Sequence, residues 1–377
     1  MRSVRRILIV QPYGIGDALF TTPLLRALRT LPTVEAIDLL LGSRTEAVFR
    51  SNPYVDQIFS LDKGAWHREG NRRMIQDTFS LWKNLRGQYD LLIDCSLQRE
   101  YGFYGKFFLG IPRRIGFNFR NRSTFLTHAL PLSNGFEGKH VIDFYCELGQ
   151  WMDLEIEDRF VEFYLSQEDR EEGEKVLRAK SVGRVGFQSR PFIAIAPGGG
   201  ESWGKDAVFK RWPVTSFVKM ISFLKARLDF ENVLVLGSQE ERILGEEIQN
   251  RRDDSANRSY NVVNLCGKIS LAAAAALLEK SLFFLANDGG LVHLAHALRV
   301  PLIAFYGPVD PKVYGPYPET PEAIPLVRTG LPCRPCYFRF RYNSACSDRE
   351  CLTDLHPEEA IEFLDQKKFW SKLCKKT

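Results

Sequence analysis

Short apolar runs alternate with longer segments of helical periodicity along most of this chain. Residues 6–10 are almost all apolar, as in a strand buried on both faces, whereas residues 17–31 place leucines at a helical spacing. The same alternation continues towards the end of the chain. It predicts strands at residues 6–10, 36–41, 57–61, 90–94, 162–165, 192–196, 232–236, 261–265, 282–286 and 301–306. It predicts helices at residues 17–31, 72–86, 139–152, 168–179, 213–227, 240–251, 271–279, 291–298 and 356–373.

The alternation falls into two halves separated by a polar stretch. Residues 181–190 are rich in Ser, Gly and Arg, which is typical of a linker. Strands that alternate with helices form parallel sheets covered by helices on both faces. We therefore expect an α/β fold with two doubly wound domains, residues 1–185 and residues 190–355.

The clearest unit lies between residues 282 and 306, where a strand, a glycine turn, a helix and a second strand follow one another. Such a unit requires parallel strands. Gly289 and Gly290 let backbone N–H groups at the helix start face outward, where the helix dipole adds positive charge that attracts phosphate. Asp288 and His293 add a hydroxyl partner and a hydrogen-bond donor. We interpret this turn as a site for the diphosphate of a nucleotide-sugar.

Another glycine turn, residues 11–17, follows the first strand and opens a helix. It is not a dinucleotide-binding fingerprint, because Leu19 occupies the third glycine position and Asp17 places a carboxylate where a pyrophosphate would bind. Two interpretations of Asp17 remain open. It can be an acid that favours the helix dipole, or a general base at a domain cleft, since loops after parallel strands line such clefts.

A third glycine turn, residues 197–200, is followed in the chain by Lys210. Glycines permit a close approach of the backbone, and a lysine supplies a positive charge for a diphosphate. A solvated surface turn would explain the same residues equally well, so the turn alone does not decide between the two.

Taken together, these motifs resemble glycosyltransferase family 9, the family of ADP-heptose:lipopolysaccharide heptosyltransferases. The resemblance covers nearly the whole chain and rests on the ordered set Gly16-Asp17, Thr22-Pro23, Lys210-x-Trp212-Pro213, Asn287-Asp288-x-Gly290-x-x-His293 and Tyr306-Gly307-Pro308-x-Asp310-Pro311. It implies a GT-B fold, in which two Rossmann-like domains face each other across a cleft and the last helix, residues 356–373, packs back on the N-terminal domain. It also implies an inverting, metal-independent transferase with the donor in the C-terminal domain.

The resemblance also implies roles for individual residues. Asp17 would be the catalytic base, and Lys210 would contact the donor phosphates, while Glu241 would contact the ribose or the base. The implied donor-binding residues are Gly198, Gly199, Lys210, Glu241, Asp288, Gly289, Gly290, Leu291 and His293. Gly289 departs from the family pattern, in which a threonine is common at this position.

Arginines crowd a short stretch of the N-terminal half, which the resemblance places on the acceptor side. Guanidinium groups suit an acceptor rich in phosphates and carboxylates. The expected acceptor-binding residues are Gly16, Arg113, Arg114 and Arg120. Phenylalanines between the arginines could also indicate single-stranded nucleic acid, but no basic helix or known module accompanies them. A solvated loop remains a rival interpretation.

Composition narrows the class of protein and its location. Of 377 residues, 45% are hydrophobic and 26% charged, as in ordinary globular proteins, and the net charge is +5. The first apolar run is too short for a signal peptide, and no apolar window is long enough to span a membrane. We expect a cytoplasmic protein that acts at the inner face of the cytoplasmic membrane, on an anionic glycolipid and not on nucleic acid.

Four clustered cysteines form the one candidate metal site, with a spacing compatible with structural zinc or with packed thiols. They are Cys333, Cys336, Cys346 and Cys351. The pair His293 and His296 lacks a third ligand at a recognisable spacing, and no Asp-x-Asp motif occurs to hold a metal-bound diphosphate. We therefore expect His296 to be a packed residue and the reaction to need no metal or cofactor.

These observations favour transfer of a heptose, or a similar sugar, from ADP-heptose to a lipopolysaccharide core or another envelope glycolipid. One alternative is a transferase of the same fold that uses another nucleotide-sugar. A second is a sugar-nucleotide epimerase, which would turn over the donor without an acceptor. A third is a nucleotide-sugar-binding protein without turnover.

Overall fold

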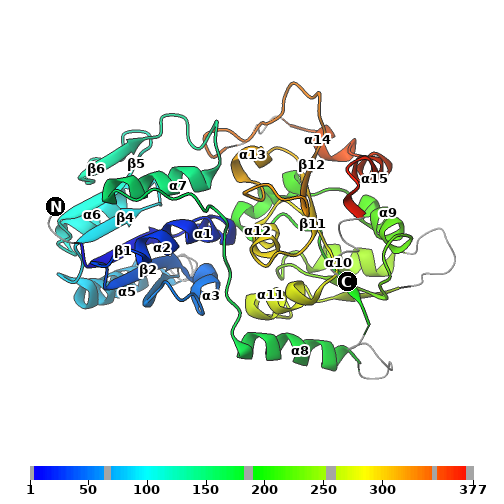
Figure 1. The fold of residues 1–377 in the computed structure, drawn as a ribbon, viewed down its shortest axis with the longest axis horizontal. Coiled ribbons are helices and arrows are strands. Elements are labelled where there is room, and N and C mark those ends of the chain that lie inside the picture. Colours follow the sequence, from blue (N-terminus) through cyan, green and yellow to red (C-terminus); the bar gives the residue numbers. More distant parts are fainter. Residues whose placement is uncertain (1–3, 63–68, 182–189, 252–259, 342–345, 371–377) are drawn as a thin grey trace. The chain divides into compact units, whose positions relative to one another are not determined.

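The computed structural model describes residues 4–62, 69–181, 190–251, 260–341 and 346–370 (Figure 1). The chain divides into two compact units, the first ending at Tyr164 and the second beginning at Leu165. Each unit has its own parallel sheet. Within the described residues, no helix is both long enough and apolar enough to cross a membrane.

The first unit is built on a sheet with the strand order β3-β2-β1-β4-β5-β6. Every pairing between these strands is parallel. The apolar runs in β1, β2 and β4 are almost entirely buried, as expected for parallel strands covered on both faces. The strands are β1 (Arg6–Gln11), β2 (Ala36–Gly42), β3 (Gln57–Leu61), β4 (Leu91–Asp94), β5 (Arg113–Asn118) and β6 (His128–Pro131).

The second unit repeats this design with the strand order β12-β11-β10-β7-β8-β9, again with parallel pairings throughout. Aromatic rings fill its core, and the Trp212 ring stacks on that of Phe305 with centres 3.8 Å apart. The strands are β7 (Phe192–Ala196), β8 (Asn232–Val235), β9 (Asn261–Asn264), β10 (Phe284–Asn287), β11 (Leu302–Tyr306) and β12 (Ala323–Val327).

Both sheets have the same topology when the strands are counted from the start of each unit. The order is 3-2-1-4-5-6, which is that of nucleotide-binding Rossmann domains. In each sheet the first and fourth strands are neighbours, and the loops that follow them leave from the same edge. Ligands of such sheets bind outside the carboxyl ends of the strands at this switch point. The predicted α/β fold with two Rossmann-like domains is confirmed.

Helices connect the strands. The predicted helix at residues 17–31 is two shorter helices, because Pro23 cannot donate to the carbonyl of Leu19, and the Thr22 hydroxyl donates to it instead (2.8 Å). The helices of the first unit are α1 (Ile15–Leu19), α2 (Thr22–Arg29), α3 (Glu46–Phe49), α5 (Asn71–Leu85), α6 (Arg99–Phe107) and α7 (Val141–Gly149). Those of the second unit are α8 (Gln167–Ser181), α9 (Val214–Lys225), α10 (Arg242–Asn250), α11 (Leu271–Lys280), α12 (Gly290–Ala297), α13 (Pro311–Tyr314), α14 (Glu350–Thr353) and α15 (Pro357–Gln366). The sequence analysis did not predict the strands β5, β6 and β12 or the helices α3, α6, α13 and α14.

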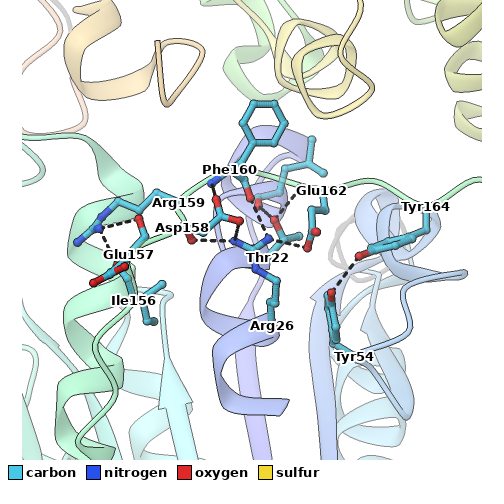
Figure 2. A network of polar contacts seen from close by, with 11 residues as sticks. Thr22, Arg26, Tyr54, Ile156, Glu157, Asp158, Arg159, Phe160, Glu162 and Tyr164 are labelled. Atoms are coloured by element: carbon cyan, nitrogen blue, oxygen red, sulfur yellow. Dashed lines mark hydrogen bonds and ion pairs between the residues drawn. The ribbon is translucent and has the colours of Figure 1, made fainter. Parts of the chain in front are cut away.

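The strand predicted at residues 162–165 is wrong, because this segment is extended but pairs with no strand among the described residues. Side chains of α2 bind its polar groups instead (Figure 2). The backbone N–H of Glu162 donates to Thr22 Oγ1 (3.0 Å). The Arg26 guanidinium lies 2.8 Å from the Glu162 carboxylate and 3.0 Å from that of Asp158. The first unit therefore ends in an extended segment that side chains hold against α2.

The boundary between the units lies earlier in the chain than the sequence predicted. Helix α8, which we expected in the first domain, packs on α11 of the second unit (Figure 1). A Cβ at Gly173 of α8 would lie 2.7 Å from the Ala276 methyl group of α11, so a glycine is needed at this contact. An ion pair between Arg170 and Glu279 (2.8 Å) flanks it. The predicted linker, residues 181–190, lies outside the described residues except at its two ends.

The C-terminal helix also differs from the expectation. Helix α15, part of the helix expected at residues 356–373, packs on α9 of the second unit, whereas the resemblance implied packing on the N-terminal domain. Ile361 and Leu364 are buried in the core of the second unit, and Asp365 pairs with Arg227 of the same unit (3.1 Å). The apolar face of α15 is therefore used within its own unit.

Candidate functional site

The loops after β7 and β10 meet at the switch point of the second sheet. A hydrogen bond joins them although its partners are 90 positions apart: Asn287 Nδ2 donates to the Pro197 carbonyl oxygen (2.7 Å). Asn287 Oδ1 accepts from the backbone N–H of Trp212 (3.1 Å). Because a buried amide bonded at both ends holds its neighbours in place, the structure brings together the turn at residues 197–200, the segment of Lys210 and the Asp288 turn.

Lys210 and Asp288 form a buried ion pair at this point. The Lys210 Nζ lies 2.8 Å from an Asp288 carboxylate oxygen, and the two side chains are only 8% and 5% exposed. The ammonium also lies 4.1 Å from the centre of the Trp203 ring. Tyr306, at the end of β11, has a buried hydroxyl whose pKa is raised by burial and by the Asp288 charge. Because an ammonium carries three N–H donors, Lys210 can hold Asp288 and an anionic ligand at once.

The turn at residues 197–200 needs glycine for two different reasons. A Cβ at Gly198 would lie 1.8 Å from Glu241 Oε1, so a side chain there would displace the Glu241 carboxylate from its backbone donors. Gly200 has a φ of +80°, in the left-handed region that favours glycine. The missing side chains leave the backbone of the turn open to close approach by a ligand.

Glu241 lies beside this turn and joins it to the loop after β8. Its Oε1 accepts from the backbone N–H of Gly200 and its Oε2 from that of Ser238, both at 2.9 Å. The side chain is buried. Each carboxylate oxygen has a further lone pair, so a ligand hydroxyl can be an additional donor.

Helix α12 begins at Gly290, with Gly289 at its N-cap. Gly289 has an extended backbone (φ 175°, ψ 176°), and a Cβ there would come no closer than 3.6 Å to Gly199. The backbone at residue 289 therefore has room for a Cβ and does not itself require the glycine that stands there in place of the expected threonine. In the first turns of the helix, Leu291 is half-buried and His293 is buried.

His296, one turn further along α12, is a packed residue, in agreement with the prediction. Its Nε2 lies 3.2 Å from the carbonyl oxygen of Tyr317. Burial lowers its pKa to about 4, so the imidazole is neutral at physiological pH. It therefore adds no charge to the site.

Asp17 lies at the switch point of the first sheet, in the turn after β1. It is the third residue of α1 and is partly exposed. Its Oδ2 accepts from the backbone N–H of Gly14 (3.3 Å). Burial, and to a smaller extent the Asp17 charge, raise the pKa of the phenols of Tyr13 and Tyr145. The hydrogen bond from Gly14 fits the interpretation of Asp17 as an acid that favours the helix dipole. The position of Asp17 after a central strand fits a general base, so the geometry is compatible with both interpretations.

Asp94, which the sequence analysis did not single out, ends β4 next to β1. It is buried, its Oδ1 accepts from the backbone N–H of Ser96 (2.8 Å), and burial raises its pKa to about 6. The argument that drew attention to Asp17, its place after a parallel strand, applies equally to the last residue of the strand predicted at residues 90–94. The position of Asp94 at the end of a predicted strand could therefore have identified it from the sequence.

The arginines expected to bind the acceptor fall at opposite ends of one strand. Arg113 and Arg114 begin β5, whereas Arg120 follows its carboxyl end, roughly 17 Å further along. The buried Arg114 guanidinium donates to the carbonyl oxygens of Phe125 (2.7 Å) and Pro112 (3.2 Å), and burial lowers its pKa. The Nε and one terminal nitrogen of Arg114 are thus used within the fold, so the structure does not favour the expected acceptor-binding role of this residue.

Arg113 shares the amino end of β5, and its guanidinium lies 5.9 Å from the centre of the Trp151 ring. The amino end of β5 lies at the edge of the sheet opposite to the loop of Asp17. The structure therefore does not support an acceptor-binding role for Arg113 beside Asp17. Gly16 precedes Asp17 in α1 and does lie at the switch-point edge.

Arg120 contributes to a hollow at the carboxyl edge of the first sheet. The hollow has a volume of ≈ 540 Å³ and is lined by Gln98, Arg99, Glu100, Arg120 and Arg122. Three guanidinium groups against one carboxylate favour an anionic ligand. The sequence analysis missed Arg99 because it did not predict α6, the helix that presents it.

The cysteine cluster does not support a zinc site. In the part of the chain that the structure describes, no three His, Cys, Asp or Glu side chains are grouped so that they could hold a metal ion. Cys351 is buried, and burial raises its pKa to about 11. Its thiol is therefore protonated at neutral pH, as in a packed apolar residue. Cys333 is exposed.

The chain is similar to proteins of one family along most of its length. The family model described as Glycosyltransferase family 9 (heptosyltransferase) matches residues 78–339. Lipooligosaccharide heptosyltransferase 2 of Haemophilus influenzae is 26% identical over 96% of this chain and 98% of its own length. The structure of Escherichia coli ADP-heptose lps heptosyltransferase II superposes with a TM-score of 0.70 at 22% identity, covering 98% of this chain and 99% of that one. A glycosyl transferase family 9 structure from Veillonella parvula gives a TM-score of 0.75 at 19% identity, with coverages of 96% and 97%.

Proposed function

The chain belongs to glycosyltransferase family 9, the heptosyltransferases, and we propose that it transfers a heptose from ADP-heptose to the carbohydrate of a lipopolysaccharide-type glycolipid. The observation that carries this proposal is the constellation at the switch point of the second sheet. There a buried lysine, a glycine turn and the start of α12 come together at the place where Rossmann domains bind nucleotides. The Haemophilus influenzae and Escherichia coli relatives named above are heptosyltransferases, which supports the identity of the sugar.

The donor diphosphate binds to the loops after β7 and β10. Backbone N–H groups at residues 289–291 and the helix dipole of α12 stabilise its charge, and Lys210 adds a positive charge within the same pocket of the fold. Asp288 keeps that ammonium in position through the 2.8 Å ion pair. Glu241 contacts the ribose or the base from the loop after β8, and His293, in the first turns of α12, contributes a further donor contact.

Asp17 is the general base of the reaction. The oxygen of an acceptor hydroxyl forms a bond to the anomeric carbon while the bond from that carbon to the diphosphate breaks, and the proton moves to the Asp17 carboxylate. Attack from the face opposite the leaving group inverts the configuration. Lys210 and the start of α12 stabilise the charge that develops on the diphosphate, so the step is metal-independent.

The acceptor binds to the first unit near Gly16 and Asp17. The hollow that contains Arg99, Arg120 and Arg122 receives its anionic groups through charge-assisted hydrogen bonds. A lipid-borne acceptor places the enzyme at the inner face of the cytoplasmic membrane, where it makes peripheral contact with the bilayer.

A panel of nucleotide-sugars measured by thermal shift tests the donor. ADP-heptose at a hundred times its Kd should raise the Tm by about 5–10 °C, because a ligand that binds only the native state stabilises it by about 2.7 kcal/mol. A rise in Tm with UDP- or GDP-sugars but not with ADP-sugars would contradict ADP-heptose as the donor. It would not contradict the glycosyltransferase activity. No shift with any nucleotide-sugar would contradict the assignment of the site.

A further inference from the structure

Helix α6 buries two glycines and one aromatic residue and leaves its other aromatic side chains exposed. Its buried positions are Tyr101, Gly102 and Gly105. A Cβ at Gly105 would lie 2.9 Å from a methyl group of Leu92, so the glycines let the helix lie close to the sheet. A helix that covers a core normally turns its large apolar side chains inward. Within the unit, Phe125 contacts the rings of Phe103 and Phe107, with centres 5.2 and 5.8 Å away, but both rings stay exposed on their other side.

These exposed rings form one continuous surface, which we call the aromatic face. It consists of Phe103, Tyr104, Phe107 and Phe108, which are 36–56% exposed and account for four of the nine exposed large hydrophobic side chains in the described part of the chain. The ring centres of Phe103 and Phe107 are 5.0 Å apart, and those of Tyr104 and Phe108 are 5.4 Å apart. The face is thus a contiguous apolar patch and not a scatter of single exposed residues.

Positive charge surrounds the aromatic face. The Lys106 ammonium lies 5.0 Å from the centre of the Phe107 ring. Residues 97–125, which contain the face and the segments beside it, hold six Arg or Lys, of which only Arg114 is buried, and a single acid, Glu100. At the amino end of the same helix, Arg99 lines the arginine-rich hollow. Rings flanked by cationic side chains are typical of surfaces that bind anionic membranes, because rings favour the head-group region and cations favour lipid phosphates.

We propose that the aromatic face of α6 docks this enzyme on a bilayer rich in anionic phospholipids. The rings enter the head-group region, and Lys106 contacts lipid phosphates. An anionic acceptor head group bound in the hollow would then lie about 13 Å, the length of α6, from the membrane-bound rings. The inference deepens the proposed function, because it names the surface through which the enzyme reaches a lipid-borne acceptor, and it rests on that function only for the identity of the acceptor.

Cosedimentation of the full chain with vesicles of phosphatidylglycerol and phosphatidylethanolamine tests this surface. The wild type should bind these vesicles, and phosphatidylcholine vesicles about tenfold more weakly. The double substitution Phe107→Ser/Phe108→Ser should lower the affinity for anionic vesicles at least about tenfold. The matched control is Ile243→Ser, which removes a 69% exposed apolar side chain from α10 in the second unit and should bind like the wild type.

Equal vesicle binding by the wild type and the double variant would overturn the proposal. A second result would also overturn it. The lipid-free wild type would self-associate in light scattering, and the double substitution would abolish this self-association while vesicle binding persists. The aromatic face would then bind a second copy of the chain and not a membrane. An unchanged Tm shows that the variant folds. Vesicle binding is measured without a nucleotide-sugar, so a failure to bind vesicles would not contradict the proposed sugar transfer. A failure to transfer sugar to a water-soluble acceptor would likewise not contradict the membrane docking.

Discussion

Replacing Asp17 with asparagine should lower kcat for sugar transfer by about 10²–10⁴-fold and leave the affinity for the donor unchanged. Asparagine keeps an oxygen that can accept the Gly14 N–H at 3.3 Å, so the cap of α1 persists. Its amide cannot accept the proton of the acceptor hydroxyl. The proposed donor site lies in the second unit and does not include residue 17, so the loss should be confined to the chemical step.

Single-turnover transfer and calorimetric titration of the donor measure the two quantities separately. Glu168→Gln is the matched control, because it also removes an exposed acid from the first turn of a helix, in α8 of the second unit. That variant should transfer sugar like the wild type. If Asp17→Asn also kept a normal kcat, Asp17 would be only an acid that favours the helix dipole, and the base would have to be sought elsewhere.

Replacing Lys210 with methionine should reduce kcat/KM by about 10²–10³-fold and lower the free energy of unfolding by about 3–5 kcal/mol. Catalysis falls because the leaving diphosphate loses a positive charge. Stability falls because Asp288, 5% exposed, remains buried without its cationic partner. Denaturant unfolding and steady-state kinetics on the same preparation measure both effects.

A double substitution separates the two consequences. Lys210→Met/Asp288→Asn removes both charges, so it should recover most of the lost stability without recovering activity. Lys280→Met is the control for an exposed pair: its partner Glu174 is 40% exposed, and the change should cost less than about 1 kcal/mol. Unchanged donor affinity in Lys210→Met would mean that the diphosphate binds elsewhere.

The switch-point loops of the second unit were largely predictable from the sequence. Each follows a short apolar run, and glycines mark each turn, so the strand, the turn and the helix of residues 284–297 follow from local rules. The partners of these loops were not predictable. The bonds from Asn287 to Pro197 and from Lys210 to Asp288 join segments that only the strand order brings together.

The failures in the first unit have a common cause. The sequence analysis placed Arg113 and Arg114 in a loop on the acceptor side, but β5 begins with them, and carbonyl oxygens around the strand accept N–H groups of Arg114. In α6 the helical pattern is inverted, because glycines occupy the buried face. Rules that place large apolar residues inside and arginines outside cannot predict either element, since tertiary contacts decide both.

We place the nucleotide-sugar at the switch point of the second sheet, and hydrogen–deuterium exchange with and without saturating ADP-heptose tests this placement. Peptides that contain residues 198–200 and 289–291 should exchange more slowly when the ligand is bound, because its phosphates accept their N–H groups. Unchanged exchange in both peptides, together with protection of residues 11–17 in the first unit, would contradict this placement.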